Sequence, residues 1–246
     1  MHIYRGTLEL LDYVFYATVE RGKVYETGAF IHNYALAYAF GLAKAVPYAH
    51  LRQQPRYREE LAPLDEAVYL TPAAPVRIAH RLVQWNTIRE GYAFPDKLPS
   101  LGYPDWGFAR VLRPESTFVF YAVVANPTRL PAAPAFRDVL EDRPARIRLG
   151  KFPGKARVRL EPATVTKTGE GEFTVKALLN WRDLAADPLV CDVLATSLPT
   201  RLLGNAHFDR GKYYEARFSD DMVRLPVEMR FLARPPETKR RKRRKR

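Results

Sequence analysis

The segment Val24–Ala43, which reads VYETGAFIHNYALAYAFGLA, carries the clearest helical pattern of this 246-residue chain. Thr27 stands where a side chain can cap the first turn, and Gly41 with Pro47 marks the end. Apolar residues recur at spacings of three and four, as on a helix with one buried face: Ile31, Tyr34, Ala35, Tyr38 and Leu42. Three more widen that face, namely Phe30, Leu36 and Phe40. We therefore expect a helix that the rest of the protein mostly covers.

Two polar residues, His32 and Asn33, stand near the start of this nearly apolar segment. One interpretation is that both lie on the exposed stripe of the helix or cap its first turn. The other is that Asn33 and the loop before it face a ligand. The sequence leaves both interpretations open.

Outside this segment the sequence predicts mainly short strands. Alternating or β-branched runs favour strands at His2–Leu11, Asp65–Leu70, Pro75–Glu90 (broken near Ala79–Arg81), Ala145–Leu149, Val158–Val165, Glu172–Leu179 and Val223–Ala233. Gly107–Leu112 and Thr117–Val124 are expected to pair with each other as a hairpin. Phe136–Arg143 is expected to form a short helix, and Pro226 makes the last strand an edge strand.

A stretch rich in glycine and lysine reads GKFPGKAR over residues 150–157. Its two glycines allow the backbone to approach a partner closely, and Phe152 can stack. Cations in and around it are Arg148, Lys151, Lys155, Arg157 and Arg159. It is not a Walker phosphate loop, because the G-K-S/T ending is missing. We interpret it as a loop that contacts a phosphate backbone; the alternative is a solvated hairpin tip.

Within Pro75–Glu90, basic residues flank an aromatic side chain. Arg81 and Arg89 supply charge, Trp85 supplies a stacking surface, and Asn86 supplies hydrogen-bonding groups. This combination suits single-stranded nucleic acid, because the bases stack while the backbone is neutralised. The alternative is that Trp85 belongs to the core, where tryptophan is usually found.

The net charge of +13 is unevenly distributed. The last eight residues, Lys239–Arg246, are all Lys or Arg and supply eight of these charges, which leaves five for the rest of the chain. We expect this tail to be disordered and able to bind phosphates without sequence preference. The body is therefore only modestly basic, and charge alone is a weak argument for nucleic-acid binding.

Composition also limits the compartment. The single cysteine, Cys191, rules out an intramolecular disulfide and fits a reducing compartment. We expect it to be a small buried residue. No run approaches the ~18 uncharged apolar residues of a membrane span, and the N-terminal segment lacks the apolar region of a signal peptide.

Little in the sequence indicates catalysis. The five histidines are scattered, and with one cysteine no zinc ligand set is expected. No nucleophile elbow or catalytic Cys–His pair is recognisable. One enzymatic hypothesis remains, metal-independent RNA cleavage to a 2′,3′-cyclic phosphate. It needs a base, an acid and a cation, which His207, Lys212 and Tyr213 are chemically able to supply.

Four segments in order carry a family resemblance: MHIYRGTLELL followed by YET and IHNYALAYAFGL, then GFARVLRPESTFVFYAV, ARIRLGKF and SLPTRLLGNAHFDRGKYYEA. From about Met1 to Leu232 the chain resembles the "Cas-five"-class subunit of the type I-D CRISPR Cascade complex, a member of the RAMP (repeat-associated mysterious protein) superfamily. The resemblance implies an α+β fold, with a ferredoxin-like (RRM-like) RAMP core and β-hairpin-rich insertions and C-terminal part. It implies one domain over residues 1–238, with a core at about 1–125, a β-rich remainder at 126–238 and a basic tail at 239–246.

The same resemblance implies a function in antiviral defense. The protein is expected to be a cytoplasmic, non-catalytic RNA-binding subunit of a type I-D CRISPR effector ribonucleoprotein, without a cofactor. It would hold the 5′ handle of the CRISPR RNA and border the PAM-proximal target DNA. Expected protein partners are the helical-backbone RAMP subunit and the large subunit, and cutting is assigned to a separate endonuclease.

The residues that we expect to contact RNA come from the stretches described above and from the N-A-H-F wording of the family. They are Asn33, Arg81, Trp85, Asn86, Arg89, Arg148, Lys151, Phe152, Lys155, Arg157 and His207. Two alternatives remain: an endoribonuclease that processes CRISPR repeat RNA, and an unspecific polyanion binder that acts through Lys239–Arg246.

Overall fold

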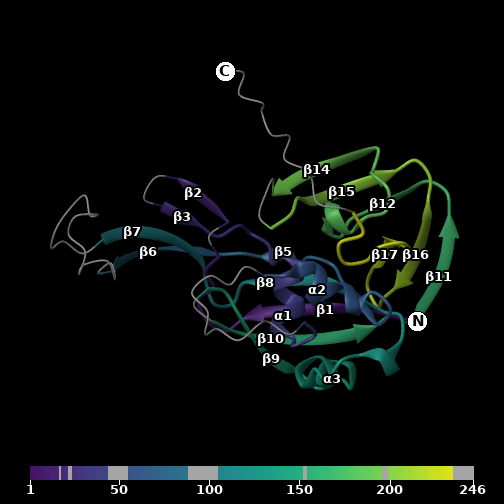
Figure 1. Ribbon diagram of the computed structural model, residues 1–246, viewed down its shortest axis with the longest axis horizontal. Coiled ribbons are helices and arrows are strands. Elements are labelled where there is room, and N and C mark those ends of the chain that lie inside the picture. Colours follow the sequence, from purple (N-terminus) through teal and green to yellow (C-terminus); the bar gives the residue numbers. More distant parts are fainter. Residues whose placement is uncertain are drawn as a thin grey trace.

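The computed structural model describes residues 1–16, 18–21, 24–43, 55–87, 105–151, 154–195 and 199–234. Three of the predictions above fall outside these residues: Arg89, Phe152 and the basic tail. Within them the protein is rich in strands and carries a few short helices (Figure 1). This confirms the expected mixed α+β class.

The central sheet is antiparallel, with the strand order β4-β8-β1-β10-β9 and with β5 also paired to β8. Its strands are β1 (His2–Leu10), β4 (Val68–Leu70), β5 (Ala74–Arg77), β8 (Thr117–Val124), β9 (Ala145–Leu149) and β10 (Gly154–Pro162). Helix α1 (Asn33–Ala39) connects β1 to β4, and α3 (Pro134–Leu140) follows β8. The first strand therefore lies between β10 and β8, and β4 lies beyond β8, as in a ferredoxin-like βαββαβ unit.

This sheet corrects the expected boundary of the core. A core that ends near residue 125 excludes β9 and β10, which belong to the same sheet. β10 pairs with β1 along most of its length. The core needs this pairing, because β1 is a central strand that requires a partner on each side.

Large aromatic side chains fill the space between the sheet and the helices. The Phe40 ring at the end of α1 lies 6.1 Å from that of Phe120 on β8 and 5.2 Å from that of Phe136 on α3. Both helices therefore cover the same face of the sheet. Gly6 on β1 makes room for Phe120, since an added Cβ would come within 2.3 Å of that ring. The opposite face of the sheet carries charged residues on β1, β9 and β10.

A second sheet forms an arm that extends to one side (left in Figure 1). It consists of β2 (Val19–Arg21), β3 (Val24–Glu26), β6 (His80–Thr87) and β7 (Asp105–Leu112). The expected hairpin between β7 and β8 is wrong, because β7 pairs with β6 and β3 instead. β8 is almost wholly apolar and already has partners on both sides in the central sheet, so no edge is left for β7.

The C-terminal part contains two small sheets. One has the order β11-β16-β17, from β11 (Val165–Glu170), β16 (Lys212–Arg217) and β17 (Met222–Pro226). The other contains β12 (Phe173–Val175), β13 (Leu179–Asn180), β14 (Val190–Ala195) and β15 (Leu202–Phe208). β17 is an edge strand, as predicted, but it ends at Pro226 and does not continue to Ala233.

Short helical turns complete the described chain: α2 (Tyr57–Leu61), η1 (Ala62–Leu64), η4 (Pro127–Arg129) and η5 (Trp181–Asp183). None of the helices in the described ranges is long and apolar enough to cross a membrane. Cys191 is a free thiol on β14 and is only half-buried, less than predicted. No group of His, Cys, Asp or Glu among the described residues is arranged to hold a metal ion.

Candidate nucleic-acid interface

The first turn of α1 is capped by His32, in agreement with one of the two interpretations of that residue. Its Nδ1 accepts a hydrogen bond from the Tyr34 N–H (3.2 Å), and its Nε2 lies 2.9 Å from the Thr200 hydroxyl. Burial lowers the pKa of His32 to about 3, so the ring is neutral at pH 7. Thr27 does not cap the helix, because its hydroxyl accepts a hydrogen bond from the Tyr16 N–H.

The prediction that Asn33 contacts RNA is wrong. Its side chain is fully buried. The amide nitrogen donates to Asp183 (2.7 Å) and to the Leu70 carbonyl (3.1 Å), and the amide oxygen accepts from Asn180 (3.1 Å). Both the amide nitrogen and the amide oxygen of Asn33 are therefore hydrogen-bonded inside the protein, and the side chain has no exposed group that could contact a base.

The reason for this burial is Asp183, a residue that no pattern in the sequence singles out. Its carboxylate is fully buried and also accepts hydrogen bonds from the Tyr34 hydroxyl (2.8 Å), the Tyr69 hydroxyl (3.1 Å) and the Leu232 N–H (2.9 Å). Burial nevertheless raises the pKa of Asp183 to about 7. This polar cluster joins α1 and β4 to the C-terminal part of the protein.

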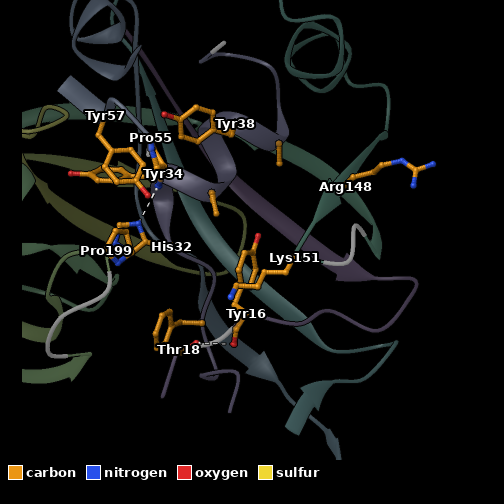
Figure 2. Close-up of a pocket in the computed structure, with 14 residues that line it drawn as sticks. Tyr16, Thr18, His32, Tyr34, Tyr38, Pro55, Tyr57, Arg148, Lys151 and Pro199 are labelled. Carbon is orange, nitrogen blue, oxygen red and sulfur yellow. Dashed lines mark hydrogen bonds between the residues drawn. The ribbon is translucent and has the colours of Figure 1, made fainter. Parts of the chain in front are cut away.

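An aromatic cleft of about 530 Å³ lies beside α1 (Figure 2). Tyr34 and Tyr38 project into it from α1, and Tyr57 stands at the start of α2. The Tyr57 ring centroid lies 5.0 Å from that of Tyr34 and 6.2 Å from that of Tyr38. Other residues that line the cleft are Tyr16, Thr18, Phe30, His32, Pro55, Gly150, Lys151 and Pro199.

The tyrosines of this cleft are neutral at ordinary pH. Burial raises the pKa of Tyr16 to about 12, and it also raises the pKa values of Tyr34, Tyr38 and Tyr57. The Tyr38 hydroxyl donates a hydrogen bond to Glu60, whose charge raises the Tyr38 pKa further. Neutral phenol rings present apolar faces for stacking and carry a polar edge.

Gly150 and Lys151, which follow β9, form the opposite wall of the cleft. The Lys151 N–H donates to the Phe15 carbonyl (2.8 Å), and Tyr16 makes a hydrogen bond with the Gly150 backbone. Gly150 has a φ of 94°, a left-handed conformation that favours glycine. The two stretches selected from the sequence therefore meet at one site. Figure 2 shows Lys151 and Tyr16 across the cleft from Tyr34 and Tyr57.

A row of cations continues from Lys151 along the open face of the central sheet. Lys155 pairs in register with Arg148, and Arg157 with Arg146, so like charges face each other across β9 and β10. Arg157 is bound to Glu9 (2.7 Å). Arg148, Lys155 and Arg159 are exposed and make no ion pair with any residue in the described ranges. Figure 2 shows the Arg148 side chain pointing away from the aromatic rings. Facing like charges favour a surface that binds anions.

Arg81 lies at the base of the arm, close to this row. Its guanidinium donates to the Tyr13 hydroxyl (2.8 Å), and the Tyr13 carbonyl lies against Gly154 at the start of β10. Trp85 and Asn86 lie further along β6, opposite Gly107 and Trp106. The side chains of Trp85 and Asn86 are outside the description, so neither interpretation of Trp85 is tested.

His207 is separated from the other predicted residues. It lies on β15 and lines a different cleft of about 520 Å³, where Nδ1 is 3.1 Å from the Thr174 hydroxyl and Nε2 is 3.4 Å from Glu172. Lys212, its proposed catalytic companion, lines a third cleft of about 300 Å³. His207 and Lys212 therefore line different clefts, which adjoin at Phe173, and no cleft among the described residues is lined by both.

Comparisons with known proteins concern the chain as a whole. A family model described as type I-D CRISPR-associated protein Cas5/Csc1 matches residues 1–234. No curated protein matches the chain. A cryo-EM structure of the type III-B Cmr-beta bound to cognate target RNA and AMPPnP is similar at 10% identity and a TM-score of 0.44, covering 89% of this chain and 86% of that one. A crystal structure of a CRISPR protein from Archaeoglobus fulgidus is similar at 10% identity and a TM-score of 0.39, covering 92% and 99%.

Proposed function

The chain belongs to the type I-D CRISPR-associated Cas5/Csc1 family, and from this premise we propose that it holds the 5′ handle of the CRISPR RNA without cutting it. As a member of this family it has a CRISPR-associated, RNA-binding role in an effector ribonucleoprotein. We propose in addition which part of the RNA the protein binds, which surface of the protein binds it, and that the bound RNA is not cut.

The meeting of the aromatic cleft with Gly150 and Lys151 carries this proposal. The hydrogen bond from the Lys151 N–H to the Phe15 carbonyl holds the backbone of Lys151 beside a cleft lined by tyrosine rings, and Lys151 makes no ion pair with any residue that the structure describes. Single-stranded RNA is recognised where unpaired bases stack on aromatic side chains while cations neutralise the backbone. A volume of about 530 Å³ lies within the range of small-ligand sites. One unpaired base of the handle would occupy the cleft.

The backbone of the handle would run along the open face of the sheet. Arg148, Lys155 and Arg159 would contact phosphates, and Arg81 would extend this row to the base of the arm. Arg157 is partly neutralised by Glu9 and would contribute less. Contacts of this kind fix the position of an RNA without reading its sequence. Any preference for the handle would therefore come from the cleft.

Partner proteins would cover another part of the surface. β14 is an edge strand, and apolar side chains in it and just before it are exposed: Leu189, Val190, Val193 and Leu194. An exposed apolar edge promotes pairing with another chain. We assign it to a neighbouring subunit of the complex, either the helical-backbone RAMP subunit or the large subunit. In the assembly the protein would border target DNA near the PAM.

The test is binding of the full chain to cognate 5′-handle RNA and to a scrambled RNA of equal length, in EDTA, over a range of salt concentrations. We expect tighter binding of the handle, and we expect the RNA to stay intact. A variant with Lys151, Lys155 and Arg157 changed to alanine should lose at least tenfold in affinity. A matched variant with Arg129, Arg137 and Arg143 changed to alanine removes the same charge elsewhere and should bind normally.

A chain that ends at Thr238 distinguishes this proposal from unspecific binding through the basic tail. We expect it to bind less tightly but to keep its preference for the handle. If the preference disappears with the tail, or if both triple variants lose affinity equally, the proposed handle-binding site, formed by the aromatic cleft and the cations of β9 and β10, is wrong.

A further inference from the structure

A smaller cleft of about 290 Å³ adjoins the aromatic cleft and shares Tyr57 with it. Three arginines line it: Arg56 and Arg58 at the start of α2, and Arg182 in η5. The two elements are far apart in the chain, so the fold itself gathers these guanidinium groups. Glu59 and Leu232 complete the lining.

The charges of this cleft are not balanced by the protein. Arg56 pairs with Glu59 (3.2 Å), an exposed ion pair of little strength. Neither Arg58 nor Arg182 makes an ion pair with any residue that the structure describes. The Arg182 Nε is buried and lacks a hydrogen-bond partner. A buried donor without an acceptor costs stability, so a group missing from the isolated chain would be expected to accept from it.

Arg182 is also held firmly in place. Its N–H donates to Asn180 (3.1 Å), and its carbonyl accepts from the Arg234 N–H (3.0 Å). Its charge acts on the Tyr34 hydroxyl, whose pKa it lowers against the larger raising effect of burial. The arginine cleft and the aromatic cleft are therefore electrostatically connected through Tyr34 as well as joined through Tyr57.

We propose that Arg58, Arg182 and Arg56 form a binding subsite for one phosphate group of single-stranded RNA. That phosphate belongs to the linkage next to the nucleotide whose base lies in the aromatic cleft, and Tyr57 separates the two subsites. Guanidinium groups bind phosphate oxygens in a bidentate manner. This inference rests on the proposed function.

An acidic segment of a partner protein has a similar chemistry, since carboxylates also pair with arginine forks. The shared Tyr57 wall favours RNA, because the linkage beside a stacked base is tied to that base by the sugar. A carboxylate has no such link to the aromatic cleft.

The test combines a protein variant with a change in the RNA. Full-length protein is titrated with handle RNA in which one phosphate at a time is replaced by an uncharged methylphosphonate. We expect one position to weaken binding about tenfold, as the loss of a charged hydrogen bond does. Arg182→Gln should weaken binding of unmodified RNA to a similar extent, and the methylphosphonate at that position should then have no further effect.

Two further variants keep the test decisive. Arg58→Gln changes an exposed residue and should reproduce the result if Arg182→Gln does not fold. Arg143→Gln removes a charge on the surface near α3 and should leave both affinities unchanged. Thermal unfolding of each variant shows whether it is folded.

The outcomes distinguish failure of the phosphate subsite from failure of the proposed function. If Arg182→Gln and Arg58→Gln bind the handle like the unmodified protein while the Lys151 triple variant is weakened, the phosphate subsite is wrong and the proposed handle-binding site stands. An acidic partner segment then becomes the better occupant. If the unmodified protein shows no preference for the handle, the proposed function is wrong, and the subsite is wrong as an RNA site as well.

Discussion

Asn33 and Asp183 lie 150 positions apart in the chain, yet the Asn33 amide nitrogen is 2.7 Å from the Asp183 carboxylate. Asn33 stands in the first turn of α1, whereas Asp183 ends η5 in the C-terminal part. Asp183 also holds the hydroxyl of Tyr34, whose ring lines the aromatic cleft. The Asn33–Asp183 contact therefore fastens the two parts of the protein together, while the separate hydrogen bond from Tyr34 to Asp183 orients one wall of the cleft.

Asn33→Ala is expected to destabilise the protein without removing an RNA contact. The change removes one of the hydrogen bonds to Asp183 and the Asn33 oxygen to which the buried Asn180 amide donates. A buried group that loses its partner costs about 1–3 kcal/mol. The midpoint of urea unfolding should fall accordingly. The affinity of the folded protein for handle RNA should stay within about twofold of the unmodified value. A loss of affinity at unchanged stability would return Asn33 to the list of RNA contacts.

Asp183 and His32 make stability depend on pH in opposite directions. The pKa of Asp183 is raised from 3.8 to about 7 by burial, so the folded state binds the proton more tightly and stability falls as the pH rises through this interval. The pKa of His32 is lowered from 6.5 to about 3 by burial, so the unfolded state binds the proton more tightly and stability falls as the pH drops below 6.5. Between about pH 4 and 6.5 the two effects oppose each other.

Single substitutions should separate them. In Asp183→Asn the His32 effect remains, so the urea midpoint should rise from pH 4.5 to pH 6.5 more steeply than in the unmodified protein. In His32→Gln the Asp183 effect remains, so the slope should shift in the opposite direction. Equal slopes in the two variants would contradict this account.

Strand positions were predictable from the sequence where the pattern is local. β8 and β9 have the predicted bounds, because alternation or a continuous apolar run records which faces are buried. The pairing of β7 was not predictable, because it depends on competition for the edges of β8 among distant segments. The order of the central strands agrees with the ferredoxin-like core that the family resemblance implies. Periodicity predicts individual strands but not their order in a sheet.

The candidate site shows the same division. Both the helical segment and the glycine-rich stretch were selected from residue types, but their meeting at one cleft depends on the fold. The Lys151 N–H, for example, is held by the Phe15 carbonyl, which belongs to neither stretch. Asn33 was misjudged because a polar residue on an apolar helix looks like a ligand contact when its buried partner is unknown. Asp183 carries no local signal, since its environment is made by residues from three distant segments: α1, β4 and the chain around Leu232.

Tyr57→Ala is expected to weaken handle binding by roughly 10- to 100-fold, because stacking of one base contributes about 1–3 kcal/mol. Tyr57→Phe keeps the ring and should bind within about threefold of the unmodified protein. Fluorescence anisotropy with labelled handle RNA measures both, with thermal unfolding as a check on folding. If the alanine and phenylalanine variants lose the same affinity for handle RNA, no base stacks on Tyr57 in the aromatic cleft.

The cations of the open sheet face should appear in the salt dependence of binding. Each phosphate contact contributes about 0.7 to the slope of log affinity against log salt for single strands. Changing Arg148, Lys155 and Arg159 to glutamine should therefore lower the slope by roughly two, for handle and scrambled RNA alike. Glutamine at Arg129, Arg137 and Arg143 serves as the matched control. An unchanged slope in the variant of Arg148, Lys155 and Arg159 would show that these residues do not contact phosphates of the RNA.

Repeat RNA incubated with the protein is expected to remain intact, both in EDTA and with Mg²⁺. Cleavage without a metal needs a base, an acid and a cation around one phosphate, and His207 and Lys212 line different clefts. His207→Ala should also leave handle affinity within about twofold, because His207 lines neither the aromatic cleft nor the row of cations on β9 and β10. End-labelled RNA on a denaturing gel reports both chemistry and site. A product that forms in EDTA and disappears with His207→Ala would make the protein a ribonuclease and would show that the cleft beside His207 closes around RNA.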